Sequence, residues 1–279
     1  MKYELVIIGA GISGLTAAFS AWEGGISSVL MIDYQKRKGG FTLPYWSSEE
    51  FAPERELLEK IALLPYEIHE QSTVVGFFPG ANGQLHQLYV QSPMGTYSIE
   101  AKKVLIASGS LEKPREAHKI PGTRPAGIMT PMMAMELVER GYQPGHKIVL
   151  IENGRISRST ATLLEKETSN LVKYAESDWE LTSIKGLSRV EGVQLRNRMT
   201  DERNEVACDT LIFAKGRVPC TFFLKGTPIE RDHHDAIIVD ATGKTNLPDI
   251  YAVGSCTCLG DDDHTNSMEL AKETAKHLF

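Results

Sequence analysis

A glycine-rich turn between a short apolar run and a helical segment constrains the fold of this chain most strongly. The apolar residues 5–8 lead directly into the sequence GAGISG at 9–14, and an alanine-rich segment with helical spacing follows. This order of strand, glycine turn and helix is the context in which a GxGxxG pattern binds a dinucleotide. Gly9 permits the tight turn, Gly11 lets a pyrophosphate approach the backbone, and Gly14 lets the helix pack against the strand.

An acidic residue stands where such a fold requires one, at the end of the next expected strand. Residues 28–32 form this strand, and Asp33 follows it, 19 residues after Gly14. An acid roughly 20 residues beyond the glycines binds a ribose hydroxyl, and N–H groups at the helix start bind the phosphates. The alternative is a glycine turn without a ligand. The residues expected to contact the nucleotide are Gly9, Ala10, Gly11, Ile12, Ser13, Gly14, Asp33 and Tyr34.

The composition is typical of a globular protein and excludes several classes of partner. The chain has 279 residues, of which 42% are hydrophobic and 24% charged, enough for one large or two ordinary domains. Its net charge of −6 gives no support for binding to nucleic acid or to an anionic membrane, since either requires a basic face. Without a run of 18 apolar residues or a basic leader, we expect no membrane insertion, no signal peptide and a cytoplasmic location.

The order of elements repeats from residue 146 onward. Residues 146–151 form an apolar strand, and the sequence ENGRIS at 152–157 stands where a second phosphate loop would stand. A helix is expected over 159–167, and a strand over 172–175 ends in Glu176. In both copies a stretch of alternating apolar and polar residues follows, which indicates half-buried strands. The pattern therefore predicts two nucleotide-binding units in one chain.

This doubled unit with a separate C-terminal segment resembles the pyridine nucleotide-disulfide reductase superfamily, which has two dinucleotide-binding domains in a thioredoxin-reductase-like order. The matching segments are 9–14, Asp33, Gly39-Gly40, Ala107-Ser108-Gly109, 208–219 and 247–254. Residues 120–145 are similar to the flavoprotein subunits that accompany glycerol-3-phosphate, glycine, proline or opine dehydrogenases, and to hydrogen cyanide synthase subunits.

The resemblance implies an α/β fold with two Rossmann-like, three-layer ββα domains, the second inserted in the first. It places the N-terminal part of an FAD-binding domain at 1–117, a shortened NAD(P)-binding-like domain at 118–244 and the C-terminal return of the FAD domain at 245–279. FAD is the implied cofactor. Phe41, Tyr45 and Trp46 would stack on the flavin or simply pack. The further residues expected at the FAD site are Gly40, Phe41, Ala107, Ser108, Gly109, Gly254 and Ser255.

The second glycine turn departs from the pattern. Glu152 and Ser157 replace its first and last glycines, and only Gly154 remains. A carboxylate beside an incoming pyrophosphate repels it. We therefore expect NAD(P)H binding to be lost or weakened, with continued NADH binding as the alternative. A weak second nucleotide site would use Asn153, Gly154, Arg155 and Arg158.

The redox dithiol of thioredoxin-reductase-like enzymes is also missing. No CxxC pair occurs, so no thiolate pair carries electrons from a flavin to a disulfide. Cys256 and Cys258 are interpreted as small residues in a turn, with a redox or metal site as the alternative; neither spacing nor nearby histidines indicate a metal. The family's Gly-Asp in the C-terminal return is Gly254-Ser255 here. The segment 261–264 is interpreted as a solvated acidic turn before the last helix, expected over about 267–278, with a catalytic role as the alternative. Asn266 or Ser267 is the expected N-cap of that helix.

Three functions follow from these observations. The first is the FAD-binding, electron-relay subunit of a dehydrogenase that has a partner dehydrogenase subunit. The second is a stand-alone NAD(P)H-dependent reductase of flavin or a small acceptor. The third is a non-catalytic subunit that binds nucleotide. No side chain is assigned as catalytic, because the flavin N5 would carry the chemistry.

Overall fold

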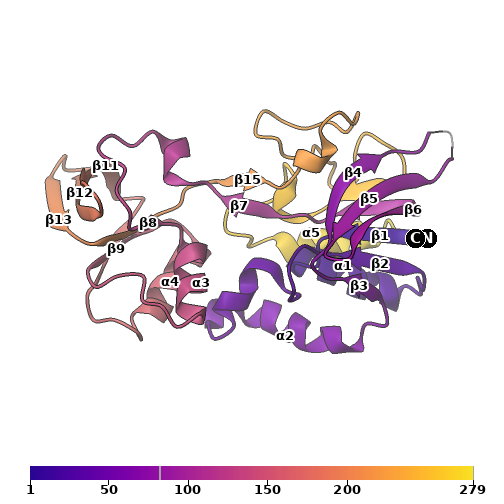
Figure 1. The fold of residues 1–279 in the computed structure, drawn as a ribbon, viewed down its shortest axis with the longest axis horizontal. Helices are drawn as coiled ribbons and strands as arrows, with labels where there is room; N and C mark the ends of the chain where they lie inside the picture. Colours follow the sequence, from indigo (N-terminus) through magenta and orange to yellow (C-terminus); the bar gives the residue numbers. More distant parts are fainter. Residues whose placement is uncertain (82, 279) are drawn as a thin grey trace. The chain divides into compact units, whose positions relative to one another are not determined.

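The chain divides into two compact units in the computed structural model, which describes residues 1–81 and 83–278 (Figure 1). Unit 1 contains residues 1–43, 52–111 and 218–279, and unit 2 contains residues 44–51 and 112–217. The chain enters and leaves the larger part of unit 2 through two paired strands, β7 (Ser110–Glu112) and β15 (Arg217–Pro219). The predicted insertion of the second domain in the first is therefore confirmed.

The centre of unit 1 is a parallel sheet that is buried on both faces. Its strands run in the order β3-β2-β1-β6. Along β1, Leu5 and Ile7 belong to one buried cluster while Val6 and Ile8 belong to another. This period-2 division explains why an uninterrupted apolar run forms a central strand. The strands are β1 (Lys2–Ile8), β2 (Val29–Ile32), β3 (Glu67–His69) and β6 (Gly95–Ile106).

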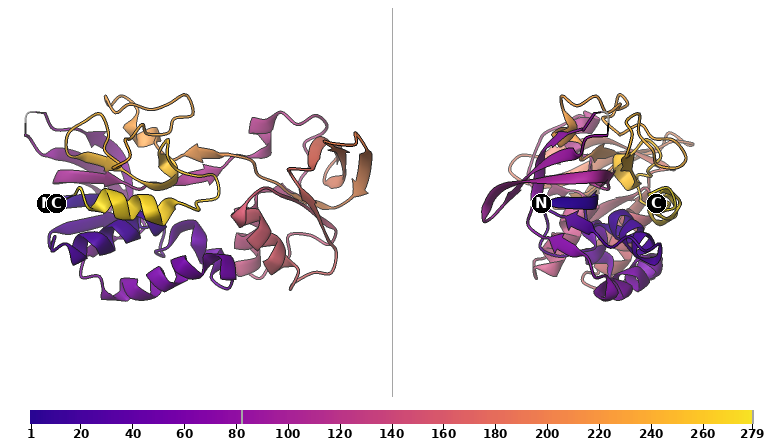
Figure 2. Two further views of the ribbon diagram at one scale, coloured as in Figure 1. Left: turned by 180° about the vertical axis from the view of Figure 1, so that it is seen from behind. Right: turned by 90° about the vertical axis from the view of Figure 1, so that its right-hand side faces the viewer.

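The two faces of this sheet are covered by different kinds of structure. Helices α1 (Ile12–Glu23), α2 (Ala52–Lys60) and α5 (Ser267–Ala275) cover one face, and α5 lies against α1 (Figure 2). The antiparallel strands β4 (Thr73–Phe78) and β5 (His86–Ser92) contribute to the cluster on the other face. The predicted three-layer ββα arrangement is therefore present.

The long strand β6 joins the C-terminal return to the sheet. One of its edges pairs with β1 over residues 100–106, in parallel. The other edge is shared: residues 95–101 pair with β5, and residues 104–106 pair in parallel with β16 (Ile250–Ala252). The end of β16 therefore lies beside the end of β6, next to the first glycine turn, as predicted for the return segment.

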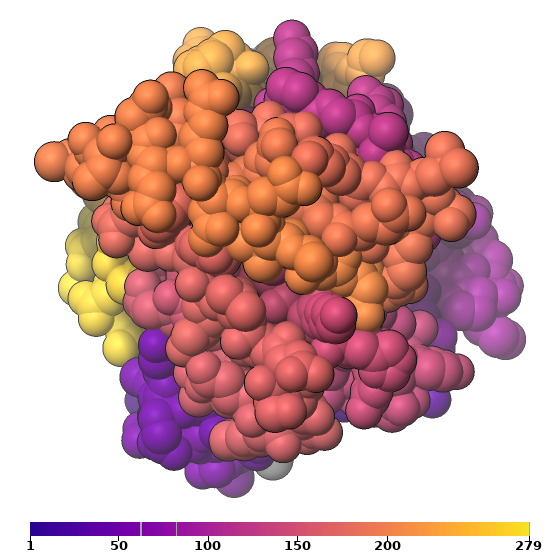
Figure 3. Space-filling view, turned by 90° about the vertical axis from the view of Figure 1, so that its left-hand side faces the viewer, coloured from indigo at the N-terminus to yellow at the C-terminus, as the bar shows by residue number. Residues whose placement is uncertain are grey.

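Unit 2 contains a smaller parallel sheet and a separate antiparallel one. The parallel sheet has the order β10-β9-β14-β8 and packs on α3 and α4. The antiparallel sheet has the order β11-β12-β13 and covers the upper part of the face shown in Figure 3. The elements are β8 (Ile128–Met129), α3 (Pro131–Glu139), β9 (Ile148–Glu152), α4 (Arg155–Leu164), β10 (Leu171–Ala175), β11 (Trp179–Gly186), β12 (Val190–Asn197), β13 (Arg203–Ala207) and β14 (Thr210–Ile212).

Short 3-10 helices occur in the connecting segments. Helix α2 is followed directly by one of them, so its C-terminal end is a tighter turn. Among the described residues, no helix combines the length and the apolar character needed to cross a bilayer. The 3-10 helices are η1 (Gly40–Tyr45), η2 (Glu49–Phe51), η3 (Ile61–Leu63), η4 (Arg115–His118), η5 (Phe222–Leu224) and η6 (Gly254–Cys256).

Two segments belong to a different unit from the one that the expected domain boundaries assigned to them. Residues 218–244, expected in the second domain, belong to unit 1 because Phe223, Leu224 and Ile237 are buried in the same cluster as Val6. Residues 44–51, expected in the first domain, belong to unit 2. In both segments, burial of side chains against residues distant in sequence decides the assignment.

Candidate FAD site

The first glycine turn brings three backbone segments into direct contact. Gly9 has a φ of +109°, and a Cβ added there would overlap the carbonyl oxygen of Ala107 at the end of β6. A Cβ at Gly14 would overlap the carbonyl oxygen of Gly9 and lie 3.3 Å from the Ala107 Cβ. Glycine is therefore required at both positions for β1, α1 and the end of β6 to pack together.

The middle glycine of the turn has a different environment. A Cβ placed on Gly11 has no described heavy atom within 4 Å. Gly11 is also the N-cap of α1, and no side chain caps this helix end. Helix starts have N–H groups without partners inside the helix, and these groups bind anions. An open space at such a helix start fits the pyrophosphate of FAD.

The acid after the second strand lies against the turn. One carboxylate oxygen of Asp33 accepts the Ala10 N–H at 2.6 Å, and the other accepts the Gln35 N–H at 2.7 Å. Burial raises the pKa of Asp33, and the two backbone hydrogen bonds act in the opposite direction. Asp33 is thus fixed beside the glycine turn, where a ribose would reach it. Tyr34, predicted at the same site, has 62% of its surface exposed.

The Gly39-Gly40 pair packs on the same turn. The Gly39 N–H donates to the Ala10 carbonyl at 2.9 Å, and a Cβ on Gly40 would lie 3.1 Å from the Gly11 Cα. The next residue, Phe41, stacks on the ring of His264, with 3.9 Å between the ring centroids. The sequence singled out His264 only as part of the acidic segment 261–264; its burial and its contact with Phe41 were not predicted, because residues so far apart in the chain leave no local signal.

The C-terminal return completes the predicted cluster. Gly254 has a φ of +76°, and a Cβ there would overlap the hydroxyl of Ser13 in the first turn of α1. A Cβ at Gly109, which has a φ of +71°, would lie 3.9 Å from the hydroxyl oxygen of the buried Ser255. The structure therefore brings together Gly9, Ala10, Gly11, Ile12, Ser13, Gly14, Asp33, Gly40, Phe41, Ala107, Ser108, Gly109, Gly254 and Ser255.

The start of α5 has a buried hydroxyl group without a hydrogen-bond partner among the described residues. This group is the Ser267 Oγ, and Asn266, the N-cap, makes no side-chain capping bond. In the acidic turn before them, Asp261 accepts the Asn266 N–H at 3.0 Å and Asp263 accepts the Thr265 N–H at 3.2 Å. The predicted position of the helix start is correct, whereas the predicted capping bond is not present.

In the second glycine turn, the side chain of Ser157 makes hydrogen bonds to the backbone of the turn itself. The hydroxyl of Ser157 accepts the Asn153 N–H at 2.8 Å and donates to the Gly154 carbonyl at 3.0 Å. Ser157 is 1% exposed. The Asn153 N–H is therefore engaged inside the protein, as is the N–H of Ala10, which has the corresponding position in the first turn and donates to Asp33. Arg155 and Arg158 contact residues of the segment 44–51.

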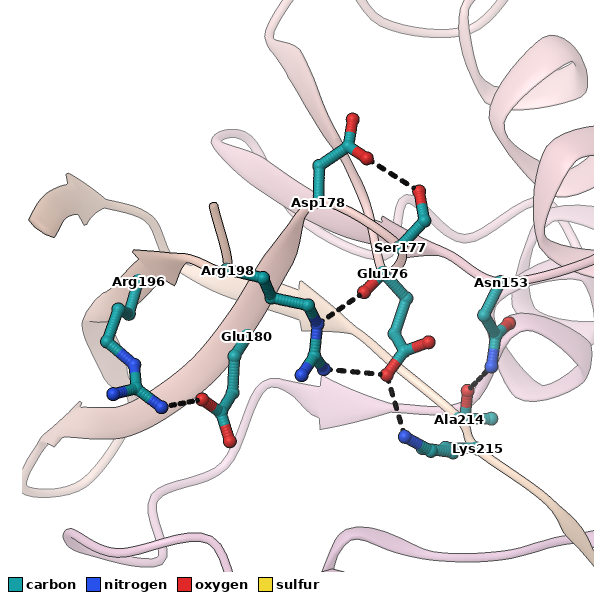
Figure 4. A network of polar contacts seen from close by, with 9 residues as sticks. All are labelled: Asn153, Glu176, Ser177, Asp178, Glu180, Arg196, Arg198, Ala214 and Lys215. Carbon is teal, nitrogen blue, oxygen red and sulfur yellow. Dashed lines mark hydrogen bonds and ion pairs between the residues drawn. The ribbon is translucent and has the colours of Figure 1, made fainter. Parts of the chain in front are cut away.

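Glu176 has the same place in unit 2 that Asp33 has in unit 1, at the end of the second strand. One of its carboxylate oxygens accepts hydrogen bonds from Arg198 at 3.0 Å and from Lys215 at 2.7 Å (Figure 4). Arg198 also donates to the Glu176 carbonyl at 3.0 Å. This acid is bound by cations rather than by the backbone of the adjacent turn.

The four cysteines are thiols without a disulfide. Cys256 is buried, with its sulfur 3.2 Å from the Val253 carbonyl oxygen, and the exposed Cys258 has its sulfur 3.8 Å from that of Val239. Burial raises the pKa of Cys256. Among the described residues, no three side chains of His, Cys, Asp or Glu form a group suited to a metal ion.

Curated proteins of several oxidoreductase classes are similar to the chain. It is 27% identical over 288 residues to a subunit of the alkyl hydroperoxide reductase of Pseudomonas putida, covering 91% of this chain and 53% of that protein. It is 23% identical to ferredoxin–NADP reductase of Picrophilus torridus, covering 90% of this chain and 85% of that protein. The chain thus spans about half of the first relative and most of the second.

Solved structures of thioredoxin reductases have the same fold. The thioredoxin reductase of T. acidophilum superposes with a TM-score of 0.76 at 21% identity, covering 99% of this chain and 97% of that one. An L-proline dehydrogenase from P. horikoshii superposes with a TM-score of 0.74 at 20% identity, covering all of this chain and 55% of that one. The family model described as pyridine nucleotide-disulphide oxidoreductase matches residues 3–177 and 179–277. The chain therefore belongs to this family of FAD-dependent oxidoreductases.

Proposed function

We propose that this FAD-dependent oxidoreductase is the electron-relay subunit of a hetero-oligomeric dehydrogenase, which exchanges electrons with a partner subunit rather than with NAD(P)H. The observation that carries the proposal is the hydrogen bond between the Ser157 hydroxyl and the Asn153 N–H. That bond ties the second turn to its own side chain, and Glu50 contacts both arginines that follow the turn, whereas the first turn has an open space at Gly11. The chain is thus equipped for one dinucleotide.

The residues of unit 1 have distinct roles toward FAD. Bound FAD supplies the redox chemistry, which is why no side chain is assigned as catalytic. Gly11 admits the pyrophosphate to the backbone, and the start of α1 provides N–H donors for it. Asp33 accepts from a ribose hydroxyl while its bond to Ala10 keeps the turn in place. The buried Ser267 hydroxyl is available to a polar group of the cofactor.

Similarity to a proline dehydrogenase supports a partner of the dehydrogenase class. Residues 120–145 carry the resemblance to subunits of such enzymes. The absence of CxxC supports a route for electrons that does not end on a disulfide substrate.

A stand-alone NAD(P)H-dependent reductase is the second candidate. The similarity to ferredoxin–NADP reductase, which covers 85% of that protein, favours it. So does Glu176, an acid at the end of the second strand of unit 2, where a ribose-binding acid would stand.

Anaerobic titration of the FAD-loaded protein with NADH and NADPH separates the two. We expect the visible absorption band of the oxidised flavin to persist for minutes after either nucleotide is added, and to bleach when a reduced partner subunit is added. Rapid bleaching by NADH or NADPH alone would reject the relay proposal and support the stand-alone reductase. A purified protein that takes up no FAD would instead support a non-catalytic, nucleotide-binding role.

A further inference from the structure

Residues 44–51, here called the strap, are separated in sequence from the rest of unit 2 but pack on its helix α4. The strap contains the end of η1 and all of η2. It follows the Gly39-Gly40 pair directly and precedes α2. The partners of the strap on α4 lie in the first six residues of the helix, directly after the second glycine turn.

Buried side chains anchor the strap. Tyr45 is fully buried and Phe51 is 1% exposed, and their rings stack with centroids 5.1 Å apart. The Tyr45 hydroxyl hydrogen-bonds to the Thr160 hydroxyl at 2.9 Å, and the Ser48 hydroxyl donates to that of Ser159 at 3.0 Å. The sequence left two roles open for Tyr45, stacking on the flavin or packing in the protein. Its contacts show that it packs inside unit 2.

The strap also engages both arginines of the second phosphate loop. The Arg155 guanidinium lies over the Phe51 ring, 4.2 Å from its centroid, and donates to the Glu50 carbonyl at 3.3 Å. The Arg158 Nε lies 3.5 Å from the Glu50 carboxylate. Arginines three residues apart share one face of a helix, so a single short segment can reach both.

We propose that the strap is an internal competitor of a nucleotide phosphate, with Glu50 in the place of the phosphate on Arg155 and Arg158. The inference rests on the proposed function. It names a segment of the chain itself that would weaken nucleotide binding to unit 2. A phosphate approaching these arginines meets the Glu50 carboxylate, which repels it, and two cations that already have partners. The strap thus keeps phosphate-bearing adenine nucleotides away from unit 2.

Calorimetric titration with ADP tests the competitor role. The full chain is kept saturated with FAD, so that ADP does not enter the FAD site. We expect Glu50→Gln to bind ADP about fivefold more tightly than the wild-type chain, because the carboxylate is lost and Arg158 becomes available. The double variant Glu50→Gln/Arg158→Gln should lose this gain. Glu56→Gln, which removes the same charge from an exposed position of α2, should bind ADP as the wild-type chain does.

Three results would overturn the inference. They are an affinity of Glu50→Gln within about threefold of wild type, an equal gain in Glu56→Gln, and a gain that survives in the double variant. Glu50 is partly exposed, and the anchoring residues Tyr45 and Phe51 stay in place, so the variant keeps the packing that folds unit 2. ADP carries no hydride, so this titration reports on the strap even if NADH bleaches the wild-type flavin and the relay proposal fails.

Discussion

At the start of α1, Gly11 leaves open space beside the helix end, whereas at the start of α4 the Ser157 hydroxyl accepts the N–H of Asn153. Each turn follows a strand of a parallel sheet and precedes a helix. Gly11 corresponds to Gly154, so the two turns differ at their last position, where Gly14 of the first turn corresponds to Ser157 of the second. Ser157 has a hydroxyl that binds the backbone of its own turn, which a glycine at that position cannot do.

The acids that follow the glycine-turn helix and its next strand, Asp33 in unit 1 and Glu176 in unit 2, also differ in their partners. Asp33 accepts two backbone N–H groups and holds the first turn, while Glu176 is bound by Arg198 and Lys215. In unit 1 the acid binds the backbone of the adjacent turn, and in unit 2 it belongs to a network of ion pairs within the unit. The two acids therefore have corresponding positions in the fold but different kinds of partner.

The largest expected effect is that of Gly14→Ala. Its Cβ would overlap the Gly9 carbonyl, a backbone atom that cannot move without displacing β1. We expect a loss of about 3 kcal/mol or more in the free energy of unfolding of unit 1, together with loss of FAD. Urea unfolding followed by circular dichroism measures the free energy of unfolding, and the visible absorption of the purified protein measures its FAD content. The matched change in unit 2, Ser157→Gly, should cost about 1 kcal/mol; equal effects in the two units would contradict the comparison.

Asp33→Asn comes next. An amide has one acceptor oxygen, so one of the N–H groups of Ala10 and Gln35 loses its partner. We expect FAD affinity to fall by about 2 kcal/mol, or roughly thirtyfold. Titration of the apoprotein with FAD, followed by quenching of flavin fluorescence, measures it. The control Glu176→Gln should leave FAD affinity as it is, and a comparable loss there would refute separate roles for the two acids.

Gly11→Ala separates folding from binding. Its Cβ meets no described atom within 4 Å, and Gly11 has a φ of −75°, which alanine adopts without strain. Stability without FAD should therefore stay within about 0.5 kcal/mol of wild type. FAD affinity should fall about tenfold, because the methyl group occupies the space needed by the pyrophosphate. Unchanged affinity would show that the cofactor does not approach this backbone.

The smallest effect concerns pH and a carboxylate of unit 2. Burial raises the pKa of Glu112, which accepts the Met132 N–H at 3.0 Å. Since the folded state holds this proton more tightly than the unfolded state, the contribution of Glu112 to stability falls as pH rises from its unfolded pKa through the higher folded value. Glu112→Gln removes this loss. The urea midpoint of the variant relative to wild type should therefore increase as pH rises from about 4.5 through the higher folded pKa, on the order of a few tenths molar; a constant difference would contradict the assignment.

Much of the fold was predictable because its signals are local. The apolar run before GAGISG, the spacing to Asp33 and the stretch of alternating residues in the first copy each indicate an element within a short window. The strand β13 and the boundary near 218 were not predicted, because short polar strands and irregular segments carry weak periodicity.

The sequence by itself determined the two glycine turns, the elements around them and the altered residues of the second turn. Each of these features depends on residues that are close together in the chain. Only the tertiary structure decided what the altered turn does with its side chains. The contact of Glu50 with Arg158 joins residues far apart in the chain, as does that of Phe41 with His264. Such contacts form where packing of buried residues brings segments together, and no periodicity in the chain encodes which segments meet.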